Sequence, residues 1–160
     1  MKTTTRFNIY LPMAAMILTA ALAVPAAAQN QVPFKGVMQG QDTHTGTVGL
    51  TTSATGTGTL LGQFSFTQEV TINLANLTDT GSARLTAANG DSIDTTVVGS
   101  AEPSDIPDLL KVTEIHTITG GTGRFAGAQG SFTVDRMHNV VTLVTWGSFH
   151  GTITSPGAAH

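Results

Sequence analysis

Apolar and polar residues alternate with a period of two along most of this chain. The clearest run extends from Leu60 to Leu74, where the even positions from Phe64 onward are apolar apart from Gln68 and the odd positions are polar. Alternation over this length predicts a long β-strand with one dry and one wet face. No segment after residue 28 has a sustained helical period, so we expect almost no helix.

Shorter alternating runs predict the remaining strands, at residues 33–41, 45–52, 82–88, 92–100, 111–119, 129–138 and 140–154. The Asn-Gly pair within residues 88–91 predicts a tight hairpin, because both residues tolerate positive φ. Two prolines and three acidic residues predict a surface loop at 101–109. About eight strands with short connections predict a sandwich or an up-and-down barrel. We favour the barrel, because closure removes exposed sheet edges, and this chain has few charged residues to prevent such edges from pairing with other chains.

Residues 120–130 read GGTGRFAGAQG, which raises three alternatives: a phosphate-binding loop, a hinge or a turn between strands. A phosphate-binding loop requires a following helix, but the next residues, SFTVDR, alternate as a strand does. We therefore interpret the segment as a strand–loop–strand connection whose glycines allow positive φ. Phe125 is expected to plug one end of the core, and Arg124 to face solvent or to cap carbonyl groups.

Five segments resemble exported bacterial relatives of the allene oxide cyclase/dirigent-type barrels: TITGGTGRFAGAQGSFTV, FKGVMQGQDT, TGTGTLLGQFSFT, TAANGDSI and GSFHGTIT. Together they are distributed over most of the range from residue 32 to residue 154. The resemblance implies an eight-stranded antiparallel up-and-down β-barrel with a central cavity. Plant members are often trimeric and steer reactive oxylipin or phenoxy-radical intermediates, whereas many bacterial relatives have no established activity. The catalytic acids of the plant enzymes lie outside these motifs, so no residue role is carried over.

The first 28 residues have the parts of a secretory signal peptide. Lys2 and Arg6 precede an apolar stretch, and three alanines end at Ala28, before Gln29. The apolar stretch is too short for a comfortable membrane span of ~20 residues, so cleavage is favoured over an uncleaved anchor. We expect one barrel domain at 29–160, with its core at about 32–154, in the periplasm or outside the cell. The chain has no cysteine, so packing and hydrogen bonds must stabilise it without disulfides.

Charge and composition narrow the expected partners. The chain has ten acidic and seven basic residues, and two of the basic ones lie in the leader. The mature protein is therefore acidic, which argues against nucleic acid and, after signal cleavage, against a membrane. The five histidines lack metal-ligand spacing, so we expect neither a metal nor a cofactor. The expected partners are a small hydrophobic ligand and, in a dimer or trimer, further copies of the chain.

The segment KVTEIHTIT places Glu114 and His116 on one strand face with Val112 and Ile118. If this face is inward, a carboxylate and an imidazole lie ~7 Å apart along the strand in apolar surroundings. Burial would then raise the pKa of the glutamate, and the pair could serve acid–base catalysis. If the face is outward, the two residues form an ordinary exposed pair.

Four further polar residues are candidates for ligand binding. Arg136 and His138 share a face with Phe132 and Val134, and Arg136 can meet Glu114 across the hairpin around the glycine-rich segment; a structural salt bridge is the favoured role. Asp42 and His44 lie near the end of the first strand, at the expected barrel rim, where they either receive a ligand or are simply solvated. Trp146 is the sole tryptophan, and we favour a packing role for it over a stacking platform.

These observations lead to three functional hypotheses. The first is an exported barrel that binds an apolar or amphipathic small molecule in its lumen. The second is a cyclase or isomerase that uses Glu114 and His116 to handle protons around a reactive intermediate. The third is a structural or surface-interaction module with a filled core. A filled lumen would argue against the first two, and whether the protein is an enzyme is left open by the sequence.

Overall fold

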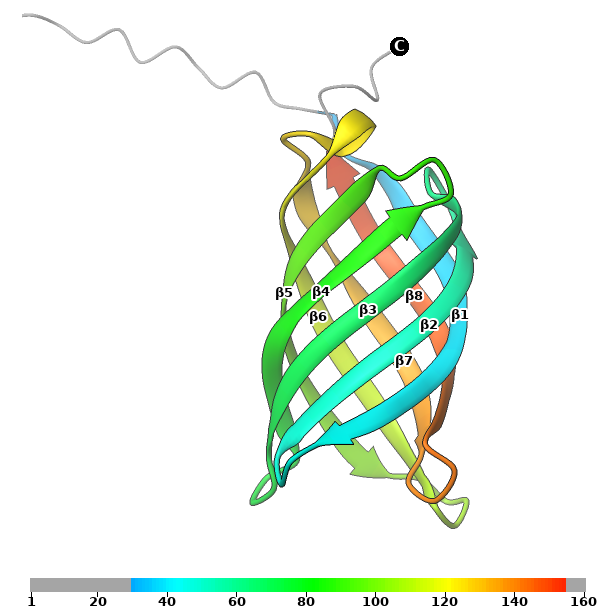
Figure 1. Ribbon diagram of the computed structural model, residues 1–160, viewed down its shortest axis with the longest axis vertical. Helices are drawn as coiled ribbons and strands as arrows, with labels where there is room; N and C mark the ends of the chain where they lie inside the picture. The colour runs from blue at the N-terminus through cyan, green and yellow to red at the C-terminus, as the bar shows by residue number, and fades with distance from the viewer. Residues whose placement is uncertain (1–29, 155–160) are drawn as a thin grey trace, which may run out of the picture.

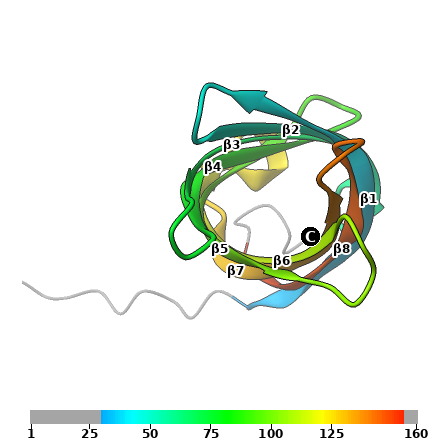
Figure 2. The ribbon, with the colours of Figure 1, turned by 90° about the horizontal axis from the view of Figure 1, so that it is seen from below.

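A computed structural model describes residues 30–154; the expected signal peptide, residues 1–28, lies outside the described residues. Eight antiparallel strands follow one another around a closed barrel, as Figures 1 and 2 show. Strand β1 closes the ring by pairing with β8, from Val32 opposite Ile153 to Gln41 opposite Val144. The strands are β1 (Val32–Thr45), β2 (Gly49–Gly58), β3 (Gly62–Asn73), β4 (Thr78–Ala87), β5 (Ser92–Pro103), β6 (Leu109–Gly121), β7 (Gln129–Asn139) and β8 (Val144–Thr154).

The predicted eight-stranded up-and-down barrel is therefore confirmed, and several of its strand boundaries differ from the expectation. The second strand begins at Gly49 instead of Thr45, because β1 continues through Thr45 and turns at Gly46, whose φ is 73°. The last strand begins at Val144, and residues 140–143 form a turn. The predicted loop at 101–109 shrinks to 104–108, because residues 101–103 pair with β6.

The predicted strand from Leu60 to Leu74 corresponds to β3, which is slightly shorter. Leu60 lies in the preceding turn with a φ of 63°, a left-handed conformation that ends the regular strand. Within β3 the even positions point inward as the alternation predicts, and Phe64, Phe66 and Val70 are buried there together with Gln68.

The glycine-rich segment is a connection between β6 and β7, as predicted. Between the end of β6 and the start of β7, at residues 122–128, the only regular structure is a single 3-10 turn, η1 (Gly123–Phe125), which lies at the upper end of the barrel in Figure 1. Phe125 is buried there and covers that end of the core. The Arg124 guanidinium lies over the Phe125 ring, 4.9 Å from its centroid, and 3.8 Å from a carboxylate oxygen of Asp91.

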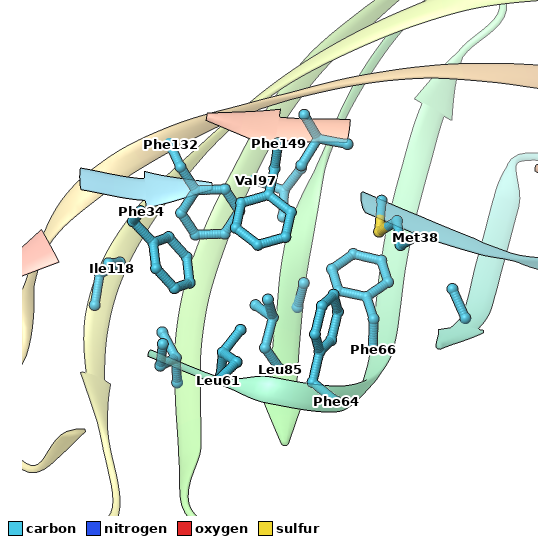
Figure 3. Packing of buried hydrophobic residues seen from close by; sticks show 14 of the residues in the cluster. Phe34, Met38, Leu61, Phe64, Phe66, Leu85, Val97, Ile118, Phe132 and Phe149 are labelled. Carbon is cyan, nitrogen blue, oxygen red and sulfur yellow. The ribbon is translucent and has the colours of Figure 1, made fainter. Parts of the chain in front are cut away.

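The half of the barrel nearest η1 is filled by aromatic and aliphatic side chains. Figure 3 shows phenylalanine rings from several strands gathered in one cluster. Four pairs among Phe34, Phe64, Phe132 and Phe149 have centroids 4.9–5.8 Å apart, in tilted or edge-on contact. Such contacts stabilise the core beyond the area that the rings bury.

The lumen is filled along its length. Glu114 and His116 are 0% exposed and Arg136 is 4% exposed, although all three project into the other half of the barrel. The central cavity implied by the family resemblance is thus occupied by the protein's own side chains. Within residues 30–154, no helix is long and apolar enough to cross a membrane.

Candidate functional site

The half of the barrel away from η1 contains a cluster of buried polar side chains, which we call the polar core. Its members lie on the inner positions of all eight strands, where the strand alternation directs them to the barrel axis. They are Asp42, Thr52, Gln68, Asp79, Thr95, Glu114, His116, Arg136, His138 and Thr145. Five of the six site residues that the sequence singled out are therefore brought together, and His44 alone lies exposed, near the end of β1.

Arg136 is the centre of the polar core. Its Nε and Nη2 donate to Glu114 Oε2 and Oε1, at 2.9 and 3.0 Å, in a two-pronged arrangement. Its Nη1 donates to Asp42 Oδ2 at 3.1 Å and to Thr145 Oγ1 at 3.0 Å. One guanidinium thus links β7 to β6, β1 and β8 inside the barrel.

Asp42 is an integral part of this network and not a solvated rim residue. Thr52 Oγ1 donates to its Oδ1 at 2.5 Å, and His138 Nδ1 donates to its Oδ2 at 2.5 Å. Burial acts to raise the pKa of Asp42, but His138, Arg136 and Thr52 outweigh it and hold the pKa below its usual value. The rim expectation was wrong because β1 continues three residues beyond Asp42.

Glu114 is held as a carboxylate. Burial acts to raise its pKa, but the Arg136 charge and the hydrogen bonds from Arg136 and Gln68 Nε2, the latter at 2.6 Å, lower it below the usual value. The expectation of a raised glutamate pKa was therefore wrong, because it considered burial without the arginine that shares the site. An ion-paired Glu114 is a poor proton donor near neutral pH.

His116 is neutral and fixed in place. Burial lowers its pKa to about 4. Its Nδ1 lies 3.0 Å from Thr95 Oγ1, and its ring stacks on Phe132 with centroids 4.7 Å apart. Glu114 and His116 therefore share the inner strand face, but each has its own partners.

Asp79 is a member of the polar core that the sequence analysis missed. Burial and the neighbouring Glu114 charge raise its pKa to about 6. Asp79 and Glu114 flank Gly99, where a Cβ atom would lie 2.6 Å from Glu114 Cγ and 2.8 Å from Asp79 Oδ1. Extending the alternation of residues 82–88 back to Thr78 would have placed Asp79 on the inner face.

Three buried side-chain atoms of the described residues have no hydrogen-bond partner: Gln68 Oε1, Asp79 Oδ1 and His116 Nε2. All three belong to the polar core. Such atoms are costly, so they mark the least satisfied part of the interior. In the described part of the chain, no group of three or more His, Asp or Glu side chains is arranged to hold a metal.

A second feature is a groove of about 1260 Å³ on the outside of the barrel wall, which we call the outer groove. Outward-facing residues of neighbouring strands line it in two rows that follow the strand pairing. One row is Met137, Trp146, Gln39, Thr55 and Ser65. The other is Asp135, Ser148, Val37, Thr57 and Gln63.

Inward-facing glycines explain why the wall is hollowed at this place. A Cβ atom on Gly36 would lie 2.5 Å from Phe149 Cε1, and one on Gly56 would lie 2.7 Å from Phe64 Cζ. A Cβ atom on Gly147 would lie 2.6 Å from Arg136 Cα. Strands β1, β2 and β8 therefore approach the core more closely than any larger residue would allow.

Trp146 lies in the outer groove and is 41% exposed. The packing role favoured from the sequence is therefore wrong. The alternation along β8 could have predicted this exposure, because Thr145, Phe149 and Ile153 face inward and Trp146 lies on the opposite face.

No model of a known protein family matches the sequence, and no curated protein matches it. Among solved structures, the barrel is similar to that of the pterocarpan synthase dirigent protein GePTS1. The TM-score is 0.57 with 11% sequence identity, over 91% of this chain and 97% of that chain. Identity this low shows a shared fold and not a shared site. The chain therefore shares the eight-stranded barrel fold of that dirigent protein.

Proposed function

We propose that this protein is a binding protein that holds a small amphipathic molecule in its outer groove. The single observation that supports this proposal is the combination of a groove of about 1260 Å³ outside with a filled lumen inside. Ligand sites are typically concave, roughly 300–1,000 Å³ in volume, and combine apolar side chains with a few polar groups. The outer groove is somewhat larger than this range, and it has the same combination of apolar side chains and polar groups.

A filled interior directs the proposal to the outside of the wall. A ligand in the polar half of the lumen would have to displace Arg136, which donates four hydrogen bonds to Glu114, Asp42 and Thr145. Separating a buried ion pair costs about 3–5 kcal/mol, and a ligand would have to offset this cost. The lumen-binding hypothesis therefore becomes a hypothesis about the outer wall.

The outer groove offers an apolar surface beside hydrogen-bonding groups. Trp146 presents an indole ring, and Val37, which is 57% exposed, and Met137 add aliphatic contact. Gln39, Thr55 and other uncharged polar residues lie next to them. A molecule with one flat apolar face and a polar edge would satisfy both kinds of group.

Isothermal titration calorimetry with a neutral panel tests this proposal. The panel contains tetraethylene glycol monooctyl ether below its micellar concentration, the flavonoid naringenin, and cellohexaose. We expect at least one of the three to bind and to shift the emission of Trp146, the sole tryptophan. The variant Trp146→Ala should lose that binding, and Val98→Ser, on the outer face of β5 away from the groove, should keep it. If neither this panel nor the further hexasaccharides named below bind, the proposal is overturned.

A second candidate function is a cyclase or isomerase in the polar core, whose substrate would have to displace side chains that fill the lumen. One observation favours it. Asp79 has a pKa raised to about 6, which suits a general acid near neutral pH. In this version Asp79 takes the proton-handling role first assigned to Glu114 and His116. The name pterocarpan synthase associates this fold with product formation in that protein. Loss of turnover in Asp79→Asn with an intact fold would support this candidate, and full activity would refute it.

We also propose that the protein is exported, with cleavage after Ala28, and that its location is the periplasm or the outside of the cell. The basic start, apolar stretch and alanine-rich end of residues 1–28 support this proposal. Amino-terminal sequencing of the protein from its source should give Gln29 first. A mature protein that begins at Met1 would contradict it.

A further inference from the structure

We infer that the occupant of the outer groove is a neutral oligosaccharide. This inference rests on the proposed function and names the chemical class of its ligand. It follows from the arrangement of polar groups, the single aromatic platform and the charge of the groove.

The hydrogen-bonding side chains of the outer groove repeat at regular intervals. Gln39, Thr55 and Ser65 face each other across β1, β2 and β3 in the strand register, next to Trp146 on β8. Neighbouring strands are ~4.8 Å apart, so this row extends over roughly 15 Å from β8 to β3. The second row repeats the arrangement two residues along each strand, with Ser148, Thr57 and Gln63. A ligand that follows these rows is an extended chain with polar groups on both edges.

These side chains both donate and accept hydrogen bonds. Threonine and serine hydroxyls and glutamine amides each offer donor and acceptor atoms, as the hydroxyls of a sugar also do. An alkyl chain in the same place would cover these polar groups without replacing the water that solvates them. The lining therefore suits a hydroxyl-rich chain better than a lipid.

Trp146 supplies one flat apolar surface beside the polar rows. A sugar ring presents hydroxyls at its edge and C–H groups on its face, so one face can stack on the indole while the edge meets Gln39 or Ser148. Trp146 is the only aromatic side chain on the outward-facing positions of the two rows. A ligand of several fused aromatic rings would need more such surface than the groove provides.

The charges of the groove favour a neutral chain. Lys111 and Glu102 line one end and face each other in the register of β5 and β6, so their charges oppose one another. Asp135 accepts a hydrogen bond from Thr113 at 3.0 Å and lies 3.7 Å from His150. Arg136 also borders the groove, but its guanidinium points into the barrel, where it is hydrogen-bonded to Glu114 and Asp42. The groove therefore has no cluster of positive charges that would attract a ligand bearing phosphate or sulfate.

The experiment is a calorimetric titration of the full mature protein with cellohexaose, xylohexaose and maltohexaose, and in parallel with tetraethylene glycol monooctyl ether and naringenin. We expect at least one hexasaccharide to bind and to shift Trp146 emission. Trp146→Ala and Gln39→Ala should each weaken that binding at least tenfold. Thr96→Ala, on the exposed outer face of β5 outside the groove, is the matched control and should leave it unchanged. Circular dichroism establishes that each variant is folded.

The outcomes separate this inference from the proposed function. If the ether or naringenin binds at Trp146 and no hexasaccharide does, the oligosaccharide inference is overturned and the binding function stands. If no compound binds, both are overturned. A dimer or trimer in sedimentation analysis, with Trp146 protected from acrylamide quenching, would show that a second copy covers the groove and would also overturn the inference.

Discussion

Two buried residues of the polar core titrate in opposite senses over the same range of pH. The pKa of Asp79 is raised from 3.8 to about 6, so the folded protein binds a proton that the unfolded chain releases. Its contribution to stability therefore falls as the pH rises from about 4 to 6. The pKa of His116 is lowered from 6.5 to about 4, so its contribution rises with pH over nearly the same interval. We expect these two slopes to oppose each other in the wild-type protein.

The variant Asp79→Asn removes the Asp79 contribution to the pH dependence of stability and leaves that of His116. An amide cannot ionise next to Glu114, so the free energy of unfolding at pH 7 should rise by on the order of 1 kcal/mol. The free energy of unfolding should then increase from pH 4 to 6.5, because Asp79 no longer offsets the stabilisation that comes from the deprotonation of His116. Urea unfolding at pH 4.5, 5.5 and 7 checks this, with the exposed-loop variant Asp105→Asn as control. An unchanged profile would show that Asp79 is ionised in the folded protein throughout.

Arg136 is the residue on which the polar core depends most. The variant Arg136→Met leaves Glu114 and Asp42 buried without their cation, so we expect a loss of about 3–5 kcal/mol in the free energy of unfolding. Arg84→Met is the matched control, because Arg84 forms its ion pair with Asp94 on the surface, at 2.6 Å, and such pairs contribute little. Equal losses in the two variants, measured by urea unfolding, would refute a central role for Arg136.

Leu60 occupies a conformation that suits glycine better than leucine. Its φ is 63°, and its side chain is 42% exposed. Leu60→Gly should raise the free energy of unfolding by roughly 0.5–1 kcal/mol, because relief of left-handed strain exceeds the entropy that glycine adds to the unfolded chain. Leu74→Gly is the control, since Leu74 is exposed without a positive φ and should lose stability. Thermal unfolding compares the two, and a lower midpoint for Leu60→Gly would contradict the argument.

Among the elements, the wall formed by β8, β1 and β2 determines the shape of the outer groove. Its inward glycines let the wall approach the phenylalanine core, so the groove depends on residues that no ligand touches. In Gly36→Ala, the new methyl group meets the Phe149 ring at 2.5 Å unless the wall moves outward. We expect a loss of about 1–3 kcal/mol in stability from this overpacking.

The same movement should make the groove shallower. Gly36→Ala is therefore expected to weaken binding of the molecule identified by calorimetry, although Gly36 faces the core. Ser53→Ala, on the exposed outer face of β2, should affect neither stability nor binding. Unchanged affinity in a folded Gly36→Ala protein would show that the shape of the groove does not depend on the inward-facing glycines.

At the scale of the whole molecule, the barrel could be predicted because its signal is local. The alternation in β3 and the Asn-Gly turn, where Gly90 has a φ of 89°, each depend on a few neighbouring residues. The turn at 140–143 could not be predicted, because Val140, Val141 and Leu143 are not among the residues that usually mark turns, such as glycine and proline. Strand ends were therefore less predictable than strand faces.

The polar core was predictable only in part, for a related reason. Glu114 and Arg136 belong to one hairpin, so their pairing follows from the sequence. Asp42 joins them from β1, 94 residues before Arg136, and only barrel closure brings the two together. The direction of the Glu114 pKa shift depends on that assembled network, and burial alone gave the wrong sign. The hollow in the wall depends in turn on how closely glycines on three strands approach the core.

The central claim is that a filled barrel binds its ligand on the outer wall. Amide chemical-shift mapping of the isotope-labelled mature protein tests it most directly, using the compound that binds in calorimetry. The changes should concentrate at residues 37–39, 55–57, 63–65 and 146–148, while the amides of Asp79, Gly99 and Glu114 stay in place. Changes centred on the polar core, with the groove strands unaffected, would contradict the claim and return the ligand to the lumen.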